Sequence, residues 1–179
     1  PAYRGRRRVS EPSGASATRG RPLRGRFAAL ALVIALADQA LKAVVVERFE
    51  RGVPVELLGD WLRITIVHNT GALFGLFRDT AAVFAIGSAA IAVAIVVAHE
   101  RAGRSPLLTL SFGLLLGGAV GNLVDRLRYG YVVDFVDMGI GAWRFYTYNV
   151  ADAAITTSIA LLFLVSLFPG VAARFGRGG

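Results

Sequence analysis

The sequence predicts a mainly α-helical, polytopic membrane protein: a four-transmembrane-helix bundle with a small extracytoplasmic β-sheet. Three observations predict this fold class. Of the 179 residues, 55% are hydrophobic and only 18% are charged, whereas soluble domains are about 25% charged. Four apolar stretches approach the roughly 20 residues that a helix needs to cross a bilayer. Between them lie two long segments, 47–79 and 125–149, that contain β-branched and aromatic residues.

The N-terminal segment 1–26 is predicted to be a disordered, arginine-rich cytoplasmic tail. It contains eight arginines and one acid, Glu11, and so carries most of the formal net charge of +8. Gly, Ser and Pro accompany the arginines, and this composition does not support a packed core. Such a tail can contact nucleic acid, but beside an apolar segment it more often marks the cytoplasmic side and contacts anionic lipid.

The apolar stretches predict four membrane helices, at about 27–46, 80–98, 106–124 and 152–172. The segments 80–98, 106–124 and 153–173 contain no charged residue. They therefore lack the polar face that a helix on the surface of a soluble bundle carries. We expect one membrane-embedded domain, 27–173, followed by a short cytoplasmic tail, 174–179.

The first apolar stretch allows two interpretations. A basic region, the apolar run 28–37 and the small residues at its end resemble a cleavable secretory signal. Asp38 and Lys42, however, lie four residues apart, so they share one face of a helix and can form an ion pair. Because an apolar run resumes at Ala43, a retained helix is favoured, with Asp38 and Lys42 in a structural role.

The charges outside the apolar stretches orient the bundle. The N-terminal tail and the link 99–105 carry more arginine than acid, and two further arginines follow residue 173. In 47–79 and 125–149, by contrast, the acids equal or outnumber the arginines. The positive-inside rule therefore places both termini in the cytoplasm and both long segments on the extracytoplasmic face.

The two long segments also have strand character. Apolar and polar residues partly alternate over 61–67, before the turn residues Asn69-Thr70-Gly71. The segments 131–136 and 143–148 are rich in aromatic and β-branched residues. Their tryptophan and tyrosine side chains suit the headgroup layer. These patterns predict a small sheet on the outer face of the membrane.

The candidate catalytic residues gather at the same boundary. The third helix is expected to end near Asp125 and the fourth to begin near Asp152, with Asp134 between them. Two carboxylates in a poorly solvated place share a proton, so one can deprotonate a water while the other protonates a leaving group. The chain has no cysteine and only two histidines. This excludes a thiol nucleophile and disfavours a multi-histidine metal site, so no metal and no cofactor are expected.

Each of these polar residues also has a purely structural explanation. Asp152 could cap the fourth helix, Asp125 could pair with Arg126, and Asp137 could be a solvated loop carboxylate. The two histidines are interpreted as surface or interface residues. The glycines within 117–121 have the small-residue spacing of closely packed helices. The residues alone do not decide which two aspartates form a catalytic pair.

Five motifs, in order along the chain, resemble the bacterial lipoprotein signal peptidase family, also called signal peptidase II. They are Asp38-Gln39-Ala40-Leu41-Lys42, Asn69-Thr70-Gly71-Ala72, GGAVGNLVDR at 117–126, GYVVDF at 130–135 and Asn149-Val150-Ala151-Asp152. With the four spans they cover roughly 27–168. One departure is Tyr148, because the family usually has phenylalanine before the last motif.

The resemblance implies a membrane aspartic endopeptidase that removes signal peptides from prolipoproteins by cutting before the diacylglyceryl-modified cysteine. It implies Asp134 and Asp152 as the catalytic pair and Asp38 and Lys42 as supports of the fold. The implied substrate-binding or supporting residues are Asn69, Gly71, Asn122, Asp125, Arg126 and Asn149. The implied partners are diacylglyceryl-modified prolipoproteins and membrane lipids, but not nucleic acid. The protein is expected to be a monomer in the bacterial inner membrane.

A small ion-coupled membrane transporter is the competing interpretation. In a transporter, Asp38, Lys42 and Asp125 would form a proton or ion relay through the bundle. Against it, the stretches 80–98 and 153–173 contain no ionisable residue. A relay along those helices would therefore not cross the membrane.

Overall fold

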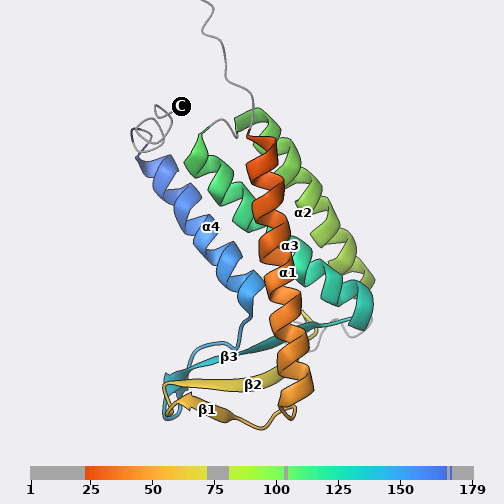
Figure 1. Ribbon diagram of the computed structural model, residues 1–179, viewed down its shortest axis with the longest axis vertical. Coiled ribbons are helices and arrows are strands. Elements are labelled where there is room, and N and C mark those ends of the chain that lie inside the picture. The colour runs from red at the N-terminus through yellow and green to blue at the C-terminus, as the bar shows by residue number, and fades with distance from the viewer. Residues whose placement is uncertain (1–22, 72–80, 103–104, 169, 171–179) are drawn as a thin grey trace, which may run out of the picture.

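In the computed structural model, four long helices form a bundle and a four-stranded antiparallel sheet lies at one end of it (Figure 1). The structure describes residues 23–71, 81–102, 105–168 and 170. The helices are α1 (Arg24–Arg48), α2 (Ala81–Ala102), α3 (Pro106–Tyr129) and α4 (Val150–Leu167). The strands are β1 (Val55–Leu58), β2 (Leu62–Asn69), β3 (Val132–Ile140) and β4 (Trp143–Arg144), in this order across the sheet. The predicted fold class is confirmed.

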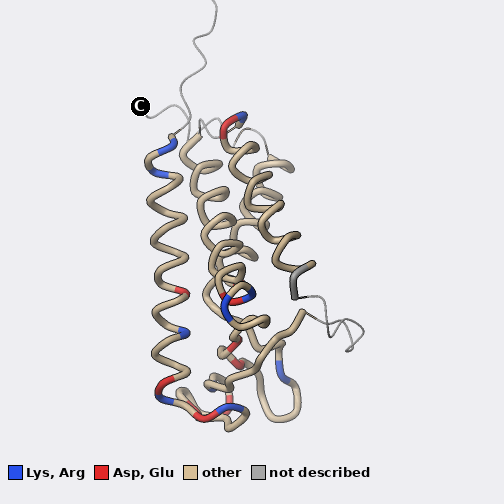
Figure 2. The backbone as a smooth tube through the Cα atoms, turned by 90° about the vertical axis from the view of Figure 1, so that its right-hand side faces the viewer, with Lys and Arg blue, Asp and Glu red and all other residues tan. Residues whose placement is uncertain are grey.

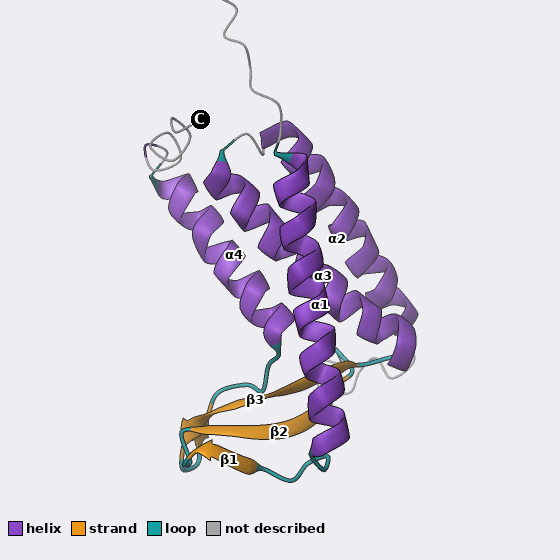
Figure 3. Ribbon diagram, in the orientation of Figure 1, coloured by secondary structure: helices purple, strands orange, loops and turns teal. Residues whose placement is uncertain are grey.

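Each of the four helices is long and apolar enough to cross a membrane, so the chain is a multi-pass membrane protein. Charged residues occur at the two ends of the bundle and in the half nearer the sheet, and the remaining part is uncharged (Figure 2). The first turn of α1 and the last turn of α4 both lie at the end opposite the sheet (Figure 3). The helices therefore present an apolar belt between two polar ends.

The helix boundaries differ from the predicted ones. α1 begins at Arg24, so the last three residues of the predicted tail, 24–26, are helical. Arg24 donates from Nε to Glu100 of α2 at 2.9 Å, which ties this first turn to the bundle. α3 continues to Tyr129 because the left-handed Gly130, with φ of 77°, ends it there. Residues 1–22 and 174–179 of the predicted tails lie outside the described residues.

Glycines let α3 approach both of its neighbours closely. A Cβ at Gly117 would lie 2.8 Å from the carbonyl oxygen of Ala31 on α1. A Cβ at Gly118 would meet the carbonyl oxygen of Ala151 on α4, well inside contact distance. The small residues therefore serve close helix packing, as the sequence predicts.

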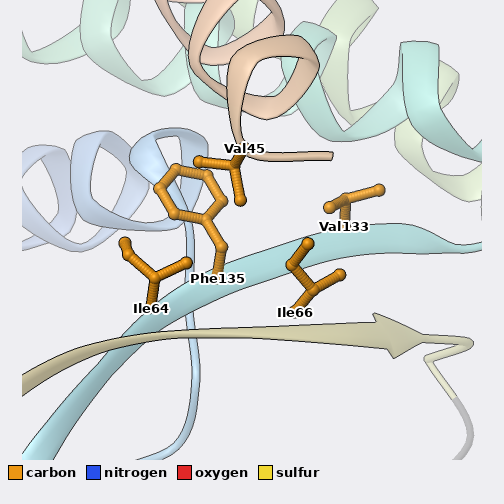
Figure 4. Close-up of a cluster of buried hydrophobic side chains, with 5 residues drawn as sticks. All are labelled: Val45, Ile64, Ile66, Val133 and Phe135. Carbon is orange, nitrogen blue, oxygen red and sulfur yellow. The ribbon is translucent and has the colours of Figure 1, made fainter. Parts of the chain in front are cut away.

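A cluster of five buried apolar side chains fastens the end of α1 to the sheet. Val45 of α1 points toward Ile64 and Ile66 of β2 and toward Val133 and Phe135 of β3 (Figure 4). Because successive residues of a strand point to opposite faces, Asp134, between Val133 and Phe135, points away from this cluster. The packing of its two neighbours therefore determines the direction of the Asp134 carboxyl group.

Candidate active site

Asp134 of β3 and Asp152 in the first turn of α4 line the same pocket. Its volume is about 630 Å³, and it lies where the sheet meets the bundle. Asn69, at the end of β2, also lines it. The rest of the wall is largely aromatic and hydroxylic, from Met138, Phe145, Tyr146, Thr147, Tyr148, Ala153, Thr156 and Thr157. The pocket therefore combines two carboxyl groups with a mostly apolar wall.

The start of α4 fixes the position of Asp152. Asn149 is the N-cap, and its Oδ1 accepts a hydrogen bond from the Asp152 backbone N–H at 2.9 Å. In return, Asp152 Oδ2 accepts from the Asn149 backbone N–H at 3.3 Å. This reciprocal arrangement is a capping box. The structural alternative for Asp152 is therefore correct in part: its carboxylate accepts a backbone N–H at the start of α4, but Asn149 and not Asp152 occupies the N-cap position.

Asp134 is held by two asparagine amides. Its Oδ2 accepts from Asn69 Nδ2 at 2.9 Å, and its Oδ1 accepts from Asn149 Nδ2 at 2.7 Å. The residue is only 2% exposed. Burial, together with the nearby Asp152 charge, raises the pKa of Asp134 to about 6, although the two amide donors act in the opposite direction. This carboxyl group therefore titrates close to neutral pH.

Asn122 of α3 contacts Asp152 directly and is linked to Asp134 through Asn149. Its Nδ2 donates to Asp152 Oδ1 at 2.8 Å, and its Oδ1 accepts from Asn149 Nδ2 at 3.2 Å. The same Oδ1 accepts from Lys42 Nζ at 3.3 Å. An amide has one accepting and one donating end, so these donors orient Asn122 with its NH₂ toward Asp152.

Lys42 is the centre of a second, buried network. Its Nζ lies 2.7 Å from Asp38 and 2.8 Å from Asp125, and all three side chains are at most 5% exposed. The ion pair between Asp38 and Lys42, expected from their spacing, is present. The expected pair between Asp125 and Arg126 is wrong, because consecutive residues of a helix point in different directions. Arg126 instead donates to the Asn122 carbonyl oxygen at 3.2 Å.

Gly71 and Gln39 hold the two networks in place. The Gly71 N–H donates to Asn69 Oδ1 at 2.9 Å, so the Asn69 NH₂ is the end that faces Asp134. Gln39, for which the sequence predicts no separate role, donates to Asp125 Oδ1 at 2.8 Å and to the Gly121 carbonyl oxygen at 3.1 Å. The only feature of the sequence that points to these contacts is the position of Gln39 next to Asp38 in the first motif.

The structure divides the predicted site residues into three groups. Asn69, Asp134 and Asp152 line the pocket. Asn122 and Asn149 contact the two carboxyl groups without lining it. The remaining predicted residues do not line the pocket and instead contact members of these groups or one another: Asp38, Lys42, Gly71, Asp125 and Arg126.

Two further expectations are wrong. Asp137 is not a solvated loop residue, because β3 extends to Ile140 and Asp137 is buried between Arg63 and Arg144, with Arg144 Nη2 at 2.8 Å. Burial acts to raise the pKa of Asp137, but hydrogen bonds from Arg144 and other donors hold it below its usual value.

The second concerns His99, one of the two histidines expected at the surface or at an interface. His99 is fully buried and stacks on Phe27 with the ring centroids 4.0 Å apart, so it is not a surface residue. His68 is half-buried and stacks on Tyr131 at 3.8 Å. Both rings lie outside the 630 Å³ pocket.

Comparisons with known sequences identify similar proteins over most of the chain. The sequence model of the signal peptidase II family matches residues 30–168. A lipoprotein signal peptidase of Moorella thermoacetica is 40% identical over 144 residues, which cover 80% of this chain and 93% of that protein. A lipoprotein signal peptidase of Burkholderia mallei is 38% identical over 138 residues, which cover 74% of this chain and 82% of that protein.

Solved structures share the fold. Two structures described as bacterial membrane enzymes superpose with TM-scores of 0.75 and 0.78, each at 28% sequence identity. They cover 82% and 84% of this chain, and 90% and 97% of their own. The match therefore extends over most of both chains.

Proposed function

Because the chain belongs to the signal peptidase II family, we propose that it is an aspartic endopeptidase that removes signal peptides from prolipoproteins. The observation that carries this proposal is the pairing of Asp134 and Asp152 in one pocket. Within the described part of the chain, both receive side-chain hydrogen bonds from asparagine amides and from no cation. Such a pair can keep a shared proton near neutral pH.

In the proposed reaction, one carboxylate of the pair accepts a proton from a water molecule, and the water oxygen attacks the scissile carbonyl carbon. The other, protonated carboxyl group hydrogen-bonds to the carbonyl oxygen as negative charge develops there. Collapse of the tetrahedral intermediate breaks the C–N bond, and the leaving nitrogen takes a proton from the pair. The two carboxyl groups together hold one proton before the reaction and one after it. We propose that these groups are those of Asp134 and Asp152.

The asparagines keep the pair in a reactive state. Amide donors orient a carboxylate without adding a full positive charge, so the pKa of Asp134 stays near 6. Asn149 donates to Asp134 and also caps the helix that carries Asp152. One residue therefore sets the relative position of both carboxyl groups. Asn122 and Asn69 complete this support, and Arg126 and Asp125 act through Asn122 and Lys42.

The pocket suits a lipid-modified peptide. Its wall includes Thr156 and Thr157 on a membrane-spanning helix and Tyr146 on the sheet side. A peptide backbone can lie against the sheet while acyl chains remain in the bilayer beside α4. We propose that cleavage occurs before a diacylglyceryl-modified cysteine for this reason.

The proposed orientation follows the charges. The arginine-rich segment 1–26 and the segment 174–179 lie in the cytoplasm, and the sheet and the pocket lie on the extracytoplasmic face of the bacterial inner membrane. The ionisable side chains of the spans gather in the half nearer the sheet or at the opposite end (Figure 2). This distribution favours a peptidase at one face over an ion-coupled transporter, which needs polar groups along its path.

The test is cleavage of a synthetic prolipoprotein peptide that carries the diacylglyceryl group, by the purified full chain in detergent. Asp134→Asn and Asp152→Asn are each expected to lower kcat by at least roughly 10³-fold, because each removes a member of the acid–base pair. Glu56→Gln, an exposed acid of β1, is the matched control and is expected to cleave normally. Wild-type rates in both aspartate variants would refute the dyad.

The same peptide without its diacylglyceryl group tests the substrate class. It is expected to be cleaved far more slowly, because the acyl chains place the scissile bond at the pocket. Equal cleavage of the two peptides would contradict the proposed substrate while leaving the dyad intact. A chelator is expected to leave the rate unchanged.

A further inference from the structure

A second pocket, of about 290 Å³, shares no lining residue with the 630 Å³ pocket. It lies between the sheet-side ends of α1 and α3 and the adjoining ends of β2 and β3. Its inner wall contains Lys42 and Asp125, which form an ion pair at 2.8 Å within the buried network that also includes Asp38. The proposed reaction uses no group on its outer rim.

The wall and rim of this pocket carry a specific set of groups. His68, Tyr131 and Tyr129 form an aromatic wall in which the His68 and Tyr131 rings are 3.8 Å apart and the Tyr129 and Tyr131 rings 5.7 Å apart. The rim carries one exposed acid, Glu47, and one exposed base, Arg128. The Arg128 guanidinium lies 5.3 Å from the centroid of the Tyr129 ring.

The two rim charges do not neutralise each other. Among the residues that the structure describes, neither Glu47 nor Arg128 forms an ion pair or a side-chain hydrogen bond. Burial and the nearby Arg51 hold the pKa of His68 below its usual value, so this ring adds no positive charge at neutral pH. The rim of the pocket thus offers one negative and one positive charge beside an aromatic wall.

The position of the rim matches the headgroup layer of a membrane. Glu47 and Arg128 are each the second-last residue of a candidate membrane span, on α1 and α3. α1 has 25 residues, which at 1.5 Å per residue exceed the roughly 30 Å of the hydrocarbon core. The last turns of these helices therefore reach the polar interface, where tyrosine side chains are also favoured.

We propose that this pocket binds the headgroup of a zwitterionic aminophospholipid, of the phosphatidylethanolamine type. The phosphate would pair with the Arg128 guanidinium, and the primary ammonium would lie between the Glu47 carboxylate and the aromatic wall. The acyl chains would run along the lipid-facing side of α1, beginning at Val46, which also lines the pocket. An anionic headgroup without an amine would satisfy Arg128 but leave Glu47 facing a like charge.

The experiment is native mass spectrometry of the delipidated full chain in detergent, with an equimolar mixture of dioleoyl phosphatidylethanolamine and dioleoyl phosphatidylglycerol. The wild type is expected to retain the ethanolamine lipid roughly three- to tenfold more than the glycerol lipid. Glu47→Gln is expected to abolish this preference by weakening ethanolamine binding alone. Arg128→Gln is expected to lower the retention of both lipids, because both contain the phosphate.

The matched controls are Glu50→Gln and Arg48→Gln, which remove exposed charges next to the pocket without changing its lining. Both are expected to retain the wild-type preference. Equal retention of the two lipids by the wild type would overturn the proposal. It would also be overturned if the control variants lost the preference for the ethanolamine lipid as fully as Glu47→Gln, because general surface charge would then explain lipid retention. The readout is lipid retention and not cleavage, so its outcome does not depend on the proposed peptidase activity.

Discussion

Two pairs of aspartates lie in adjoining networks at the same end of the bundle, but they are held differently. Asp38 and Asp125 flank the Lys42 ammonium at 2.7 and 2.8 Å. Asp134 and Asp152 are instead hydrogen-bonded by the amides of asparagines. A full positive charge offsets a buried carboxylate charge far better than an amide dipole does. The first pair is therefore suited to holding the fold and the second to exchanging a proton.

Asn122 connects the two networks, because it accepts from Lys42 and donates to Asp152. The orientation of a residue that touches the proposed catalytic pair is thus determined by the structural pair. The comparison predicts that variants of the Lys42 network mainly lower stability, whereas variants of the Asp134 network mainly change proton binding.

The largest expected effect is on stability. Lys42→Met leaves Asp38 and Asp125 buried at no more than 1% side-chain exposure without their cation. Removing one partner of a buried ion pair typically costs about 3–5 kcal/mol. We expect the free energy of unfolding in detergent to fall by about this amount, measured by thermal or denaturant unfolding of the purified chain.

Arg48→Met is the matched control for Lys42→Met, because Arg48 lies on the same helix with an exposed side chain. Its effect is expected to stay within about 0.5 kcal/mol. A Lys42→Met variant as stable as this control would show that the buried aspartates do not need the ammonium, and the proposed division between the two pairs would fail.

A smaller effect is expected from the pH dependence of stability. The folded state raises the pKa of Asp134 from 3.8 to about 6, so the folded chain binds this proton more tightly than the unfolded chain does. The resulting stability is fully present below pH 4 and is lost as the pH rises through 6. Each pKa unit corresponds to 1.36 kcal/mol, so the free energy of unfolding should fall by at most about 3 kcal/mol.

The measurement compares the free energy of unfolding of the wild type and of Asp134→Asn at pH 4 and pH 7. The wild type should lose stability relative to the variant as the pH rises, because the variant cannot titrate at this position. Glu56→Gln, which removes an exposed acid, should follow the wild type. A relative gain of wild-type stability at pH 7 would mean that the pKa of Asp134 is lowered and not raised.

These networks also show what the sequence can predict. The apolar stretches and the strand-like alternation were sufficient for the fold class, because helix length and side-chain period are local properties. The pairing of Asp38 with Lys42 was predictable from their spacing within one helix. The pairing of Lys42 with Asp125 was not, because it joins α1 to α3 and depends on how the helices are rotated against each other.

The misassigned residues have related causes. The sequence predicts a loop at Asp137 because its strand character ends at 136, whereas β3 continues to Ile140 through the glycine at 139. The sequence predicts His99 at the surface or at an interface, because its burial depends on contact with Phe27 of another helix. Asn149 and Asp152 are both residue types that favour helix N-termini, and only the backbone geometry shows that Asn149 is the N-cap.

The smallest expected effect concerns the pKa of Asp134 itself. Asn69→Ala removes the 2.9 Å hydrogen bond from the amide to Asp134 Oδ2. A hydrogen bond to the charged form lowers the pKa of a carboxyl group, so its loss should raise the pKa of Asp134 further, by less than about one unit. The limb of the kcat/KM pH profile that lies near pH 6 should therefore move to higher pH. Thr70→Ala, the exposed neighbouring residue, should leave the limb unchanged, and a shift to lower pH in Asn69→Ala would contradict the proposed role of the amide donors.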